Sequence, residues 1–308
     1  MSKRFAAGAI GAAFLSTIII AQQPVVRTAN PIARGMQLTD FPRTVKVAEH
    51  VYTYEDFHAG PETFTTTNLF VVTSDGVLVA DGQGSPAETR GLVDAIRTVT
   101  PTPNTTVVIA SDHGDHTAGN ASFPAGVHYI IHPNSKAILD QARSGWKPPA
   151  DAELVADKKT ITMGGEEMQI RFLGRSHTGG DLAVWLPREK ILFLSEIYLN
   201  RVFPAMRSAY PSEWLKALDH AEAMNANIYI AGHGFTETGP VSREEIHHYH
   251  QAMATVIAEA TRLYKAGVPV DRAVAQANWG EYASWTLASS QGPIAIRKVY
   301  EELSGTLK

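Results

Sequence analysis

The alternation of apolar and polar residues predicts short strands interspersed with helices along most of the chain. Leu92, Ile96 and Val99 recur at helical spacing within residues 85–99. Further helices are expected over 134–143, 211–224 and most of 241–308. Apolar and β-branched runs typical of strands occupy residues 44–47, 51–54, 68–73, 77–80, 105–110, 127–131, 161–173, 183–186, 191–194 and 228–231.

This order of elements predicts a mixed α/β fold (α+β) in which the helices and sheets are arranged in four layers. The strands occur both in strand–turn–strand units and in strand–helix units. Two sheet layers with helices on both outer faces accommodate such a mixture, so we expect an αββα sandwich. Residues 45–308 show no dividing linker and are expected to form one domain, mostly helical over 241–308. Residues 22–44, which are interrupted by prolines and lack periodicity, are expected to form an extended arm.

The N-terminus has the order of a secretory signal. Lys3 and Arg4 precede the apolar stretch 5–20, and the small residue Ala21 follows it. The stretch of about 16 residues is short for a membrane span, which needs roughly 20. We therefore expect 1–21 to be a signal peptide and the protein to be periplasmic or secreted, with an uncleaved anchor as the alternative.

The composition limits which partners the protein can bind and which residues can hold a metal. The chain has 308 residues, of which 44% are hydrophobic and 19% charged, and a formal net charge of -4. This charge gives no basic field for nucleic acid, so a small-molecule substrate is the expected partner, and the oligomeric state stays open. The sequence has no cysteine, so a metal site must use histidine and carboxylate.

Several predicted strands are followed by side chains that bind metals. Side chains at strand ends meet at one rim of a sheet, where loops converge on a ligand. Asp115 is one of these side chains, and glycines close to it in the sequence allow tight loops. His132 also follows a strand and is a further candidate. The residues that carry the expectation of a metal site are His113, His116, His177, Glu196 and His233.

The segment 111–116 reads Ser-Asp-His-Gly-Asp-His and resembles the His-x-His-x-Asp-His signature of the metallo-β-lactamase superfamily. The later motifs follow in that family's order, with His177 as the next ligand, Glu196 at the bridging carboxylate and His233 as the last ligand. Asp81 matches a strand-end aspartate that supports the metal loop. The resemblance implies an αββα fold and zinc-dependent hydrolysis, but it says little about the substrate.

Two departures from the family pattern change the expected metal site. Ser111 stands in place of the first histidine, and Glu196 in place of the bridging aspartate. The resemblance leaves one zinc position with only His113 and His177, and a neutral hydroxyl is a poor zinc ligand. The other position keeps its full set, which is Asp115, His116 and His233. One tightly bound Zn²⁺ is therefore favoured over two, with Glu196 as a ligand of either position and a metal-free chain as the remaining alternative.

The resemblance implies a zinc-bound hydroxide that cleaves a small-molecule ester, lactone or amide bond, β-lactams included. Asp115, His113 and Ser111 are the expected catalytic residues, as proton acceptor, oxyanion partner and orienting hydroxyl. A second hypothesis is hydrolytic dehalogenation of an activated aromatic, because dehalogenases of chlorinated aromatic nitriles also carry Ser at the first signature position; Asn200 extends that resemblance loosely. A third hypothesis is a non-catalytic binding protein that retains the fold.

The residues that form the walls of the pocket are harder to predict from the sequence. The segment 203–206 is apolar and would favour a hydrophobic substrate if it flanked the metal. The aromatic and imidazole side chains considered for these walls are Phe57, His58, Phe64, Trp146, Tyr198, Phe203 and Tyr210.

Overall fold

Twelve strands pair into one continuous sheet in the computed structural model, which describes residues 26–58, 63–143 and 145–307. The expected signal peptide lies outside the described residues. The strands are β1 (Arg43–Ala48), β2 (Val51–His58), β3 (Phe64–Thr73), β4 (Gly76–Ala80), β5 (Asn104–Ile109), β6 (His128–Ile131), β7 (Glu153–Leu154), β8 (Lys158–Met163), β9 (Glu166–Phe172), β10 (Leu182–Leu186), β11 (Ile191–Leu199) and β12 (Ile228–His233). The α-helices are α1 (Pro86–Val99), α2 (Gly114–Thr117), α3 (Pro133–Gln141), α4 (Pro211–Ala223), α5 (Gly239–Lys265), α6 (Val270–Gln276) and α7 (Ala288–Leu303).

The sheet consists of two halves that meet at the metal-loop end of the molecule. Its strand order is β7-β6-β5-β4-β3-β12-β11-β10-β9-β8, with β2 and β1 added beside β3. The halves join where β3 pairs with β12, at Thr66 and His233. This junction places a predicted metal ligand at the contact between the two halves.

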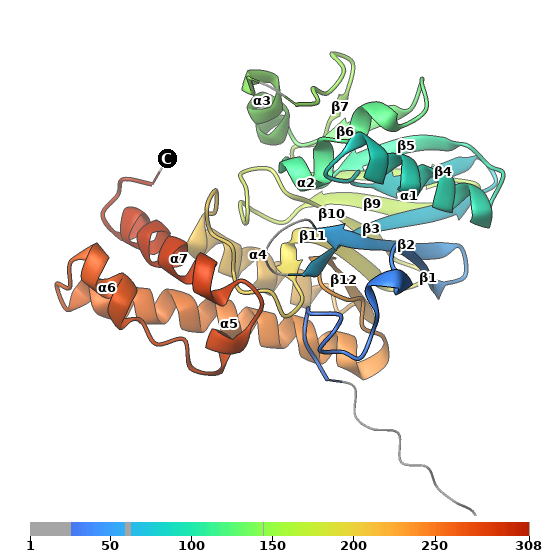
Figure 1. The fold of residues 1–308 in the computed structure, drawn as a ribbon. Coiled ribbons are helices and arrows are strands. Elements are labelled where there is room, and N and C mark those ends of the chain that lie inside the picture. Colours follow the sequence, from blue (N-terminus) through green and yellow to red (C-terminus); the bar gives the residue numbers. More distant parts are fainter. Residues whose placement is uncertain (1–25, 59–62, 144, 308) are drawn as a thin grey trace, which may run out of the picture.

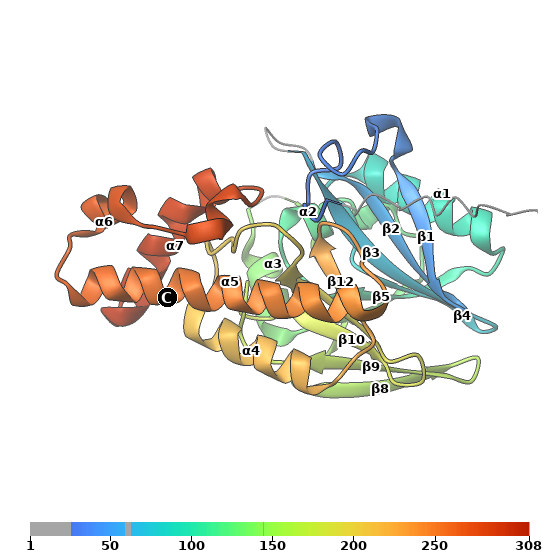
Figure 2. The same ribbon diagram turned by 90° about the horizontal axis from the view of Figure 1, so that it is seen from below.

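Hydrophobic clusters fill the spaces between four layers. Leu78 and Val108 of one half-sheet and Val184 and Phe193 of the other are fully buried in the same cluster, between the halves. The outer clusters pack α1 and α3 against the first half and α4 and α5 against the second. Figure 1 shows α1 and α3 above the strands and α5 below, and Figure 2 shows α4 and α5 crossing the lower face. The predicted αββα sandwich is confirmed.

Helix α1 illustrates how local sequence sets these elements. Ser85 caps its N-terminus by accepting a hydrogen bond from the backbone N–H of Glu88, and Pro86 occupies the first turn. Leu92 and Ile96 are buried, as their spacing predicts.

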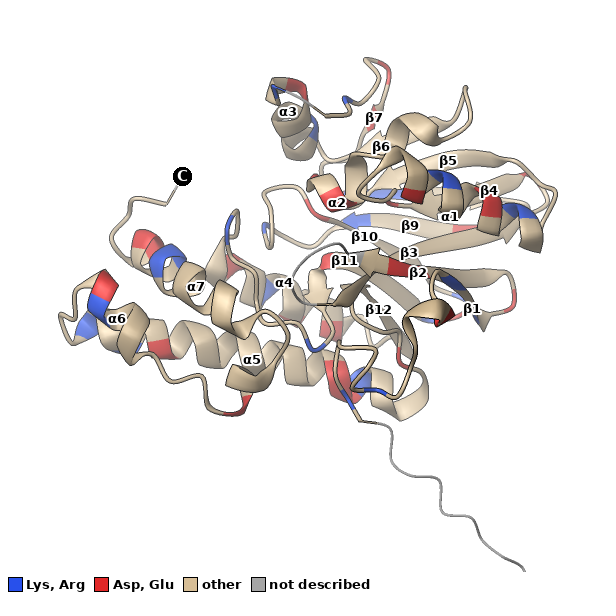
Figure 3. Cartoon of the chain, viewed as in Figure 1, with Lys and Arg blue, Asp and Glu red and all other residues tan. Residues whose placement is uncertain are grey.

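The C-terminal region is helical, as expected, and the N-terminal arm is attached to it by ion pairs. Arg27 lies 2.7 Å from Glu244, and Arg34 lies 2.8 Å from Glu237. Figure 3 shows acidic and basic residues mixed over both halves of the molecule. Within the described part of the chain, the helices are all too short or too polar to cross a membrane.

Candidate metal centre

Asp81 fixes the loop that carries the signature residues. It follows β4 with a positive φ of 63° and is fully buried. One carboxylate oxygen accepts the backbone N–H of Ala110 (2.7 Å) and of Ser111 (3.2 Å). The other oxygen accepts the Ser195 hydroxyl at 2.6 Å and lies 3.1 Å from His116 Nδ1. The supporting role that the resemblance implies for Asp81 therefore has a direct geometric basis.

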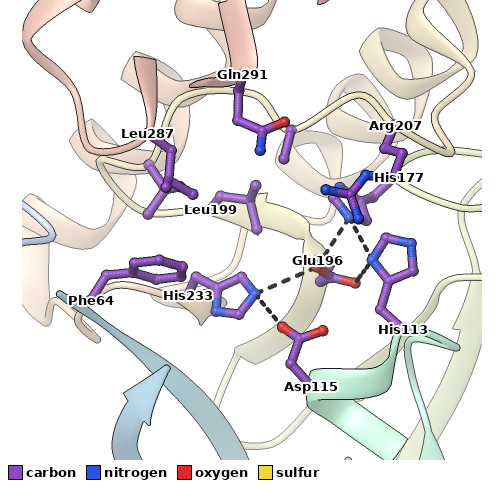
Figure 4. Close-up of a pocket in the computed structure, with 12 residues that line it drawn as sticks. Phe64, His113, Asp115, His177, Glu196, Leu199, Arg207, His233, Leu287 and Gln291 are labelled. Atoms are coloured by element: carbon purple, nitrogen blue, oxygen red, sulfur yellow. Dashed lines mark hydrogen bonds and ion pairs between the residues drawn. The ribbon is translucent and has the colours of Figure 1, made fainter. Parts of the chain in front are cut away.

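Side chains from helix α2 and from strands β11 and β12 form the first candidate metal group, which consists of Asp115, His116, Glu196 and His233. His233 Nε2 lies 3.1 Å from Asp115 Oδ2 and 3.4 Å from Glu196 Oε1. His116 Nε2 lies 3.4 Å from His233 Nε2. Figure 4 shows Asp115, Glu196 and His233 converging at the floor of a pocket.

The hydrogen bonds on the far side of both imidazoles fit a cation between them. His116 Nδ1 faces Asp81, and His233 Nδ1 lies 3.1 Å from the carbonyl oxygen of Thr65. Because both outer nitrogens have acceptors, each Nδ1 carries a proton, and each Nε2 is the atom that can bind a cation once it has lost its own proton. The two Nε2 atoms lie 3.4 Å apart beside two carboxylates, an arrangement that suits a divalent ion, and such outer partners are typical of metal-binding histidines.

The second candidate group is smaller and shares Glu196. It consists of His113, His177 and Glu196, with His177 Nε2 lying 3.0 Å from Glu196 Oε1 and His113 Nδ1 lying 3.1 Å from Glu196 Oε2. The Ser111 hydroxyl is fully buried and donates to Glu196. This position thus has two imidazoles and a shared carboxylate, as the sequence departure implies.

Glu196 reaches both groups because of a bulge in β11. The sequence places it just after a strand, but β11 continues to Leu199. The register with β12 shifts at Ser195, whose φ is 45°. This irregularity turns the carboxylate of Glu196 toward the histidines.

The carboxylates raise the pKa of His113, His116 and His233 and so favour their charged forms when no metal is present. Burial opposes a charge on His113, but Glu196 outweighs it and raises the pKa of His113 to about 10. Burial likewise opposes a charge on His233, and hydrogen bonds to Asp115 and Glu196 raise its pKa to about 10. Burial disfavours the Glu196 anion, yet His177, His113 and His116 bring its pKa well below the usual range. A metal ion must therefore displace protons from this cluster.

The pocket above these residues has a volume of about 210 Å³ and one apolar side. Arg207, Leu287 and Gln291 also line the pocket, and they are not predicted from the sequence because none of them belongs to a metal-binding motif. The apolar lining consists of Phe64, Leu199, Val202, Ala205 and Leu287. Arg207 and Gln291 are the polar residues that line it beside the metal groups.

The wall candidates from the sequence divide between this pocket and the core. Phe64 lines the pocket, whereas Tyr198 and Phe203 are buried in the core. Trp146 packs on Tyr129, with ring centroids 5.1 Å apart. The side chain of His58 lies outside the described part of the structure. Two further candidates, Phe57 and Tyr210, line neighbouring cavities.

Two other candidates have structural roles. His132 precedes α3, where its Nδ1 accepts the backbone N–H of Asn134, and its ring stacks on Phe172 at 4.2 Å. Asn200 is buried and donates to the carbonyl oxygen of Phe235 at 2.7 Å. Neither residue belongs to a candidate metal group.

Comparisons with known proteins agree with the fold and the signature. No family model matches the chain. The 2,4-dinitroanisole O-demethylase subunit alpha of Nocardioides sp. (strain JS1661) is 22% identical over 225 residues, which span 72% of this chain and 66% of that protein. Metallo-beta-lactamase IND-1 of Chryseobacterium indologenes is 24% identical over 203 residues, or 64% of this chain and 84% of that protein.

Solved structures share the architecture at low identity. A metallo-beta-lactamase from Pontibacter korlensis superposes with a TM-score of 0.61 at 20% identity, over 68% of this chain and 98% of its own. A double mutant of the sec-alkyl sulfatase PisA1 superposes with a TM-score of 0.68 at 15% identity, over 86% of this chain and 51% of its own.

Proposed function

These relatives and structures point to the metallo-β-lactamase superfamily, whose members include hydrolases, and we propose that this protein is a zinc-dependent hydrolase of a small molecule. The expectation of a zinc metallo-hydrolase fits the relatives. The observation that carries the proposal is the convergence of two imidazoles and two carboxylates within ligand distance of one another at the floor of a pocket. We propose cleavage of an ester, lactone or amide bond.

Asp115, His116, His233 and Glu196 would hold the ion. A zinc ion at such a site lowers the pKa of water toward ~7 and polarises an electrophilic carbonyl. The set uses nitrogen and carboxylate oxygen, which are ordinary zinc ligands in a chain that has no cysteine.

The remaining polar residues take positioning and proton-transfer roles. The Asp115 side chain faces the pocket and is the proposed acceptor of the proton from the attacking water. His113 also lines the pocket, with its side chain 26% exposed, and we propose that it donates to the developing oxyanion. Ser111 is buried behind Glu196, so we propose that it orients this carboxylate rather than the substrate.

The two metal groups differ in their ligands, and we propose one tight zinc ion. The second group lacks a third imidazole because Ser111 occupies that place. Ser111→His should raise the zinc content of the purified protein from about one toward two per chain. An unchanged content, measured by atomic emission, would mean that His113 and His177 do not face a zinc position.

Metal analysis combined with a substrate screen tests the function. The purified protein should contain about one zinc ion per chain and hydrolyse at least one substrate among aryl esters, lactones and β-lactams. Chelation should abolish turnover and added zinc should restore it. Less than a tenth of a zinc ion per chain, with no turnover, would instead favour the non-catalytic binding protein.

One relative favours a second candidate reaction, which is attack of the activated water on an aromatic carbon. That relative is named for O-demethylation of 2,4-dinitroanisole, an aromatic ether activated by nitro groups. Nitroaryl ethers and haloaromatics therefore belong in the same screen. Turnover of these compounds without ester or lactone hydrolysis would favour this candidate.

A further inference from the structure

Two cavities meet at Arg207. The first is the metal pocket described above, and the second is a neighbouring cavity of about 530 Å³. Arg207 lines both, and its neighbour Ser208 lines the second while its hydroxyl lies 3.4 Å from His113 Nε2. The segment 207–208 thus forms the boundary between the metal pocket and the neighbouring cavity.

Arg207 differs from the other arginines near the site in its lack of a carboxylate partner. Arg175 forms an ion pair with Glu213, and Arg201 forms one with Glu245. Within the described ranges, no ion pair or hydrogen bond is found for the Arg207 side chain, which is exposed. An arginine that borders a pocket and has all its donors free can bind an anionic ligand group.

The neighbouring cavity adds a second cation. Lys298 of α7 lines it, although its ammonium also lies 3.0 Å from Glu301. Asp112 lines the same cavity but is only 9% exposed. A ligand anion is therefore expected at the Arg207 side of the cavity, away from the Asp112 carboxylate.

The opposite side of the metal pocket suits an apolar group. Phe64, Leu199 and Leu287 line it, and they come from β3, β11 and the residue before α7. Leu287 has a φ of 68°, an uncommon conformation for a leucine, and its side chain lines the pocket. Apolar and cationic surfaces thus flank the metal groups on different sides.

We infer that the substrate is an amphipathic anion, whose apolar part lies against Phe64 and Leu287 and whose carboxylate or sulfonate is bound by Arg207 at the mouth of the neighbouring cavity. This inference rests on the proposed hydrolase function for the position of the scissile bond. Arg207 is then a specificity-determining residue.

A matched pair of esters tests the inference by kinetics. The probes are para-nitrophenyl pentanoate and the para-nitrophenyl monoester of glutarate, which differ by a methyl group against a carboxylate. Arg207→Gln should lower the ratio of kcat/KM for the anionic over the neutral ester by on the order of tenfold. Arg97→Gln, an exposed position on α1 with the same charge change, should leave the ratio unchanged.

Binding without turnover separates this inference from the proposed function. Calorimetry on the protein as purified compares phenylbutyrate with phenylbutanamide. Wild type and Arg97→Gln should bind phenylbutyrate more tightly than the amide, and Arg207→Gln should lose about tenfold in phenylbutyrate affinity while its affinity for the amide stays within about twofold.

The outcomes of the two experiments are distinguishable. Equal phenylbutyrate affinity in wild type and Arg207→Gln overturns the inference, because the carboxylate then binds elsewhere, for instance at the metal. If neither ester is hydrolysed but Arg207→Gln loses phenylbutyrate affinity, the ester-hydrolase function fails and the anion site stands.

Discussion

Among the proposed ligands, Asp115 is the one whose side chain would link the metal most directly to the chemistry. Its carboxylate contacts His233 and faces the pocket. Asp115→Asn removes one anionic ligand and the proposed proton acceptor, so zinc content should fall well below one per chain and kcat/KM by on the order of a thousandfold or more. Asp94 is an exposed aspartate of α1, and Asp94→Asn is the matched control, which should retain the zinc content and kcat/KM of the wild type. Full zinc content in Asp115→Asn would remove Asp115 from the ligand set.

The charged histidines make zinc binding dependent on pH. His113 and His233 have pKa values raised to about 10 from the ordinary 6.5, so both carry protons in the metal-free protein at neutral pH. A ligand nitrogen must lose its proton, so zinc affinity should rise with pH, and each zinc ion should release at least one proton at pH ~7.5. Calorimetry in buffers of different ionisation enthalpy measures this release.

The raised pKa values of these two histidines also determine how the stability of the metal-free protein changes with pH. A raised pKa means that the folded state binds the proton more tightly than the unfolded state. The contribution of His113 and His233 is therefore fully present below pH 6.5 and is lost as pH rises through about 10. A metal-free protein whose urea midpoint increases steadily over that window would contradict the charged cluster.

At the scale of elements, the contact between β11 and β12 controls the position of both Glu196 and His233. Gly232 lies against this contact, and a Cβ there would meet the backbone of Ser195 at 2.6 Å. Gly232→Ala should therefore separate the strands, lower zinc affinity and cost about 1–3 kcal/mol of unfolding free energy. Gly114→Ala is the control, because a Cβ at Gly114 meets nothing within 4 Å. Similar zinc affinities in the two variants would contradict this account.

The elements also show which features the sequence could predict. The helix over 85–99 and the strand over 105–110 are confirmed as α1 and β5, because their apolar spacing reports burial directly. The place of Glu196 within β11 was not predictable, since the bulge depends on pairing with β12 rather than on local spacing.

Metal-binding residues can be predicted from the sequence, whereas most residues that line the pocket cannot. The signature residues are recognisable because each carries a metal-binding group at a strand end. Leu287 and Gln291 reach the pocket only through the packing of α7 on α5, and no local pattern distinguishes them from other residues of an amphipathic helix. The residues that form the apolar side of the pocket could therefore be identified only from the structure.

At the scale of the whole molecule, the candidate metal centre lies where the two halves of the sheet meet. Asp115 and His116 follow β5 in the first half, whereas Glu196 and His233 belong to β11 and β12 in the second. The ladder between the two halves pairs Thr66 of β3 with His233 of β12, so an ion bound by residues of both halves would add a further link at this junction. Because the unfolded chain does not hold these ligands together, zinc should stabilise only the folded state.

This coupling predicts a thermal shift that depends on ligands from both halves. With free zinc at ~1,000 times its dissociation constant, the stabilisation should be about 4 kcal/mol. Differential scanning calorimetry should show a higher Tm with zinc than with chelator, and both halves should unfold in one transition. Asp115→Asn in the first half and His233→Ala in the second should each abolish the zinc-dependent shift, since each change removes one of the four proposed ligands and leaves too few for tight binding. A zinc-dependent shift that survives in His233→Ala would remove His233 from the ligand set and would separate zinc binding from the pairing of β12 with β3.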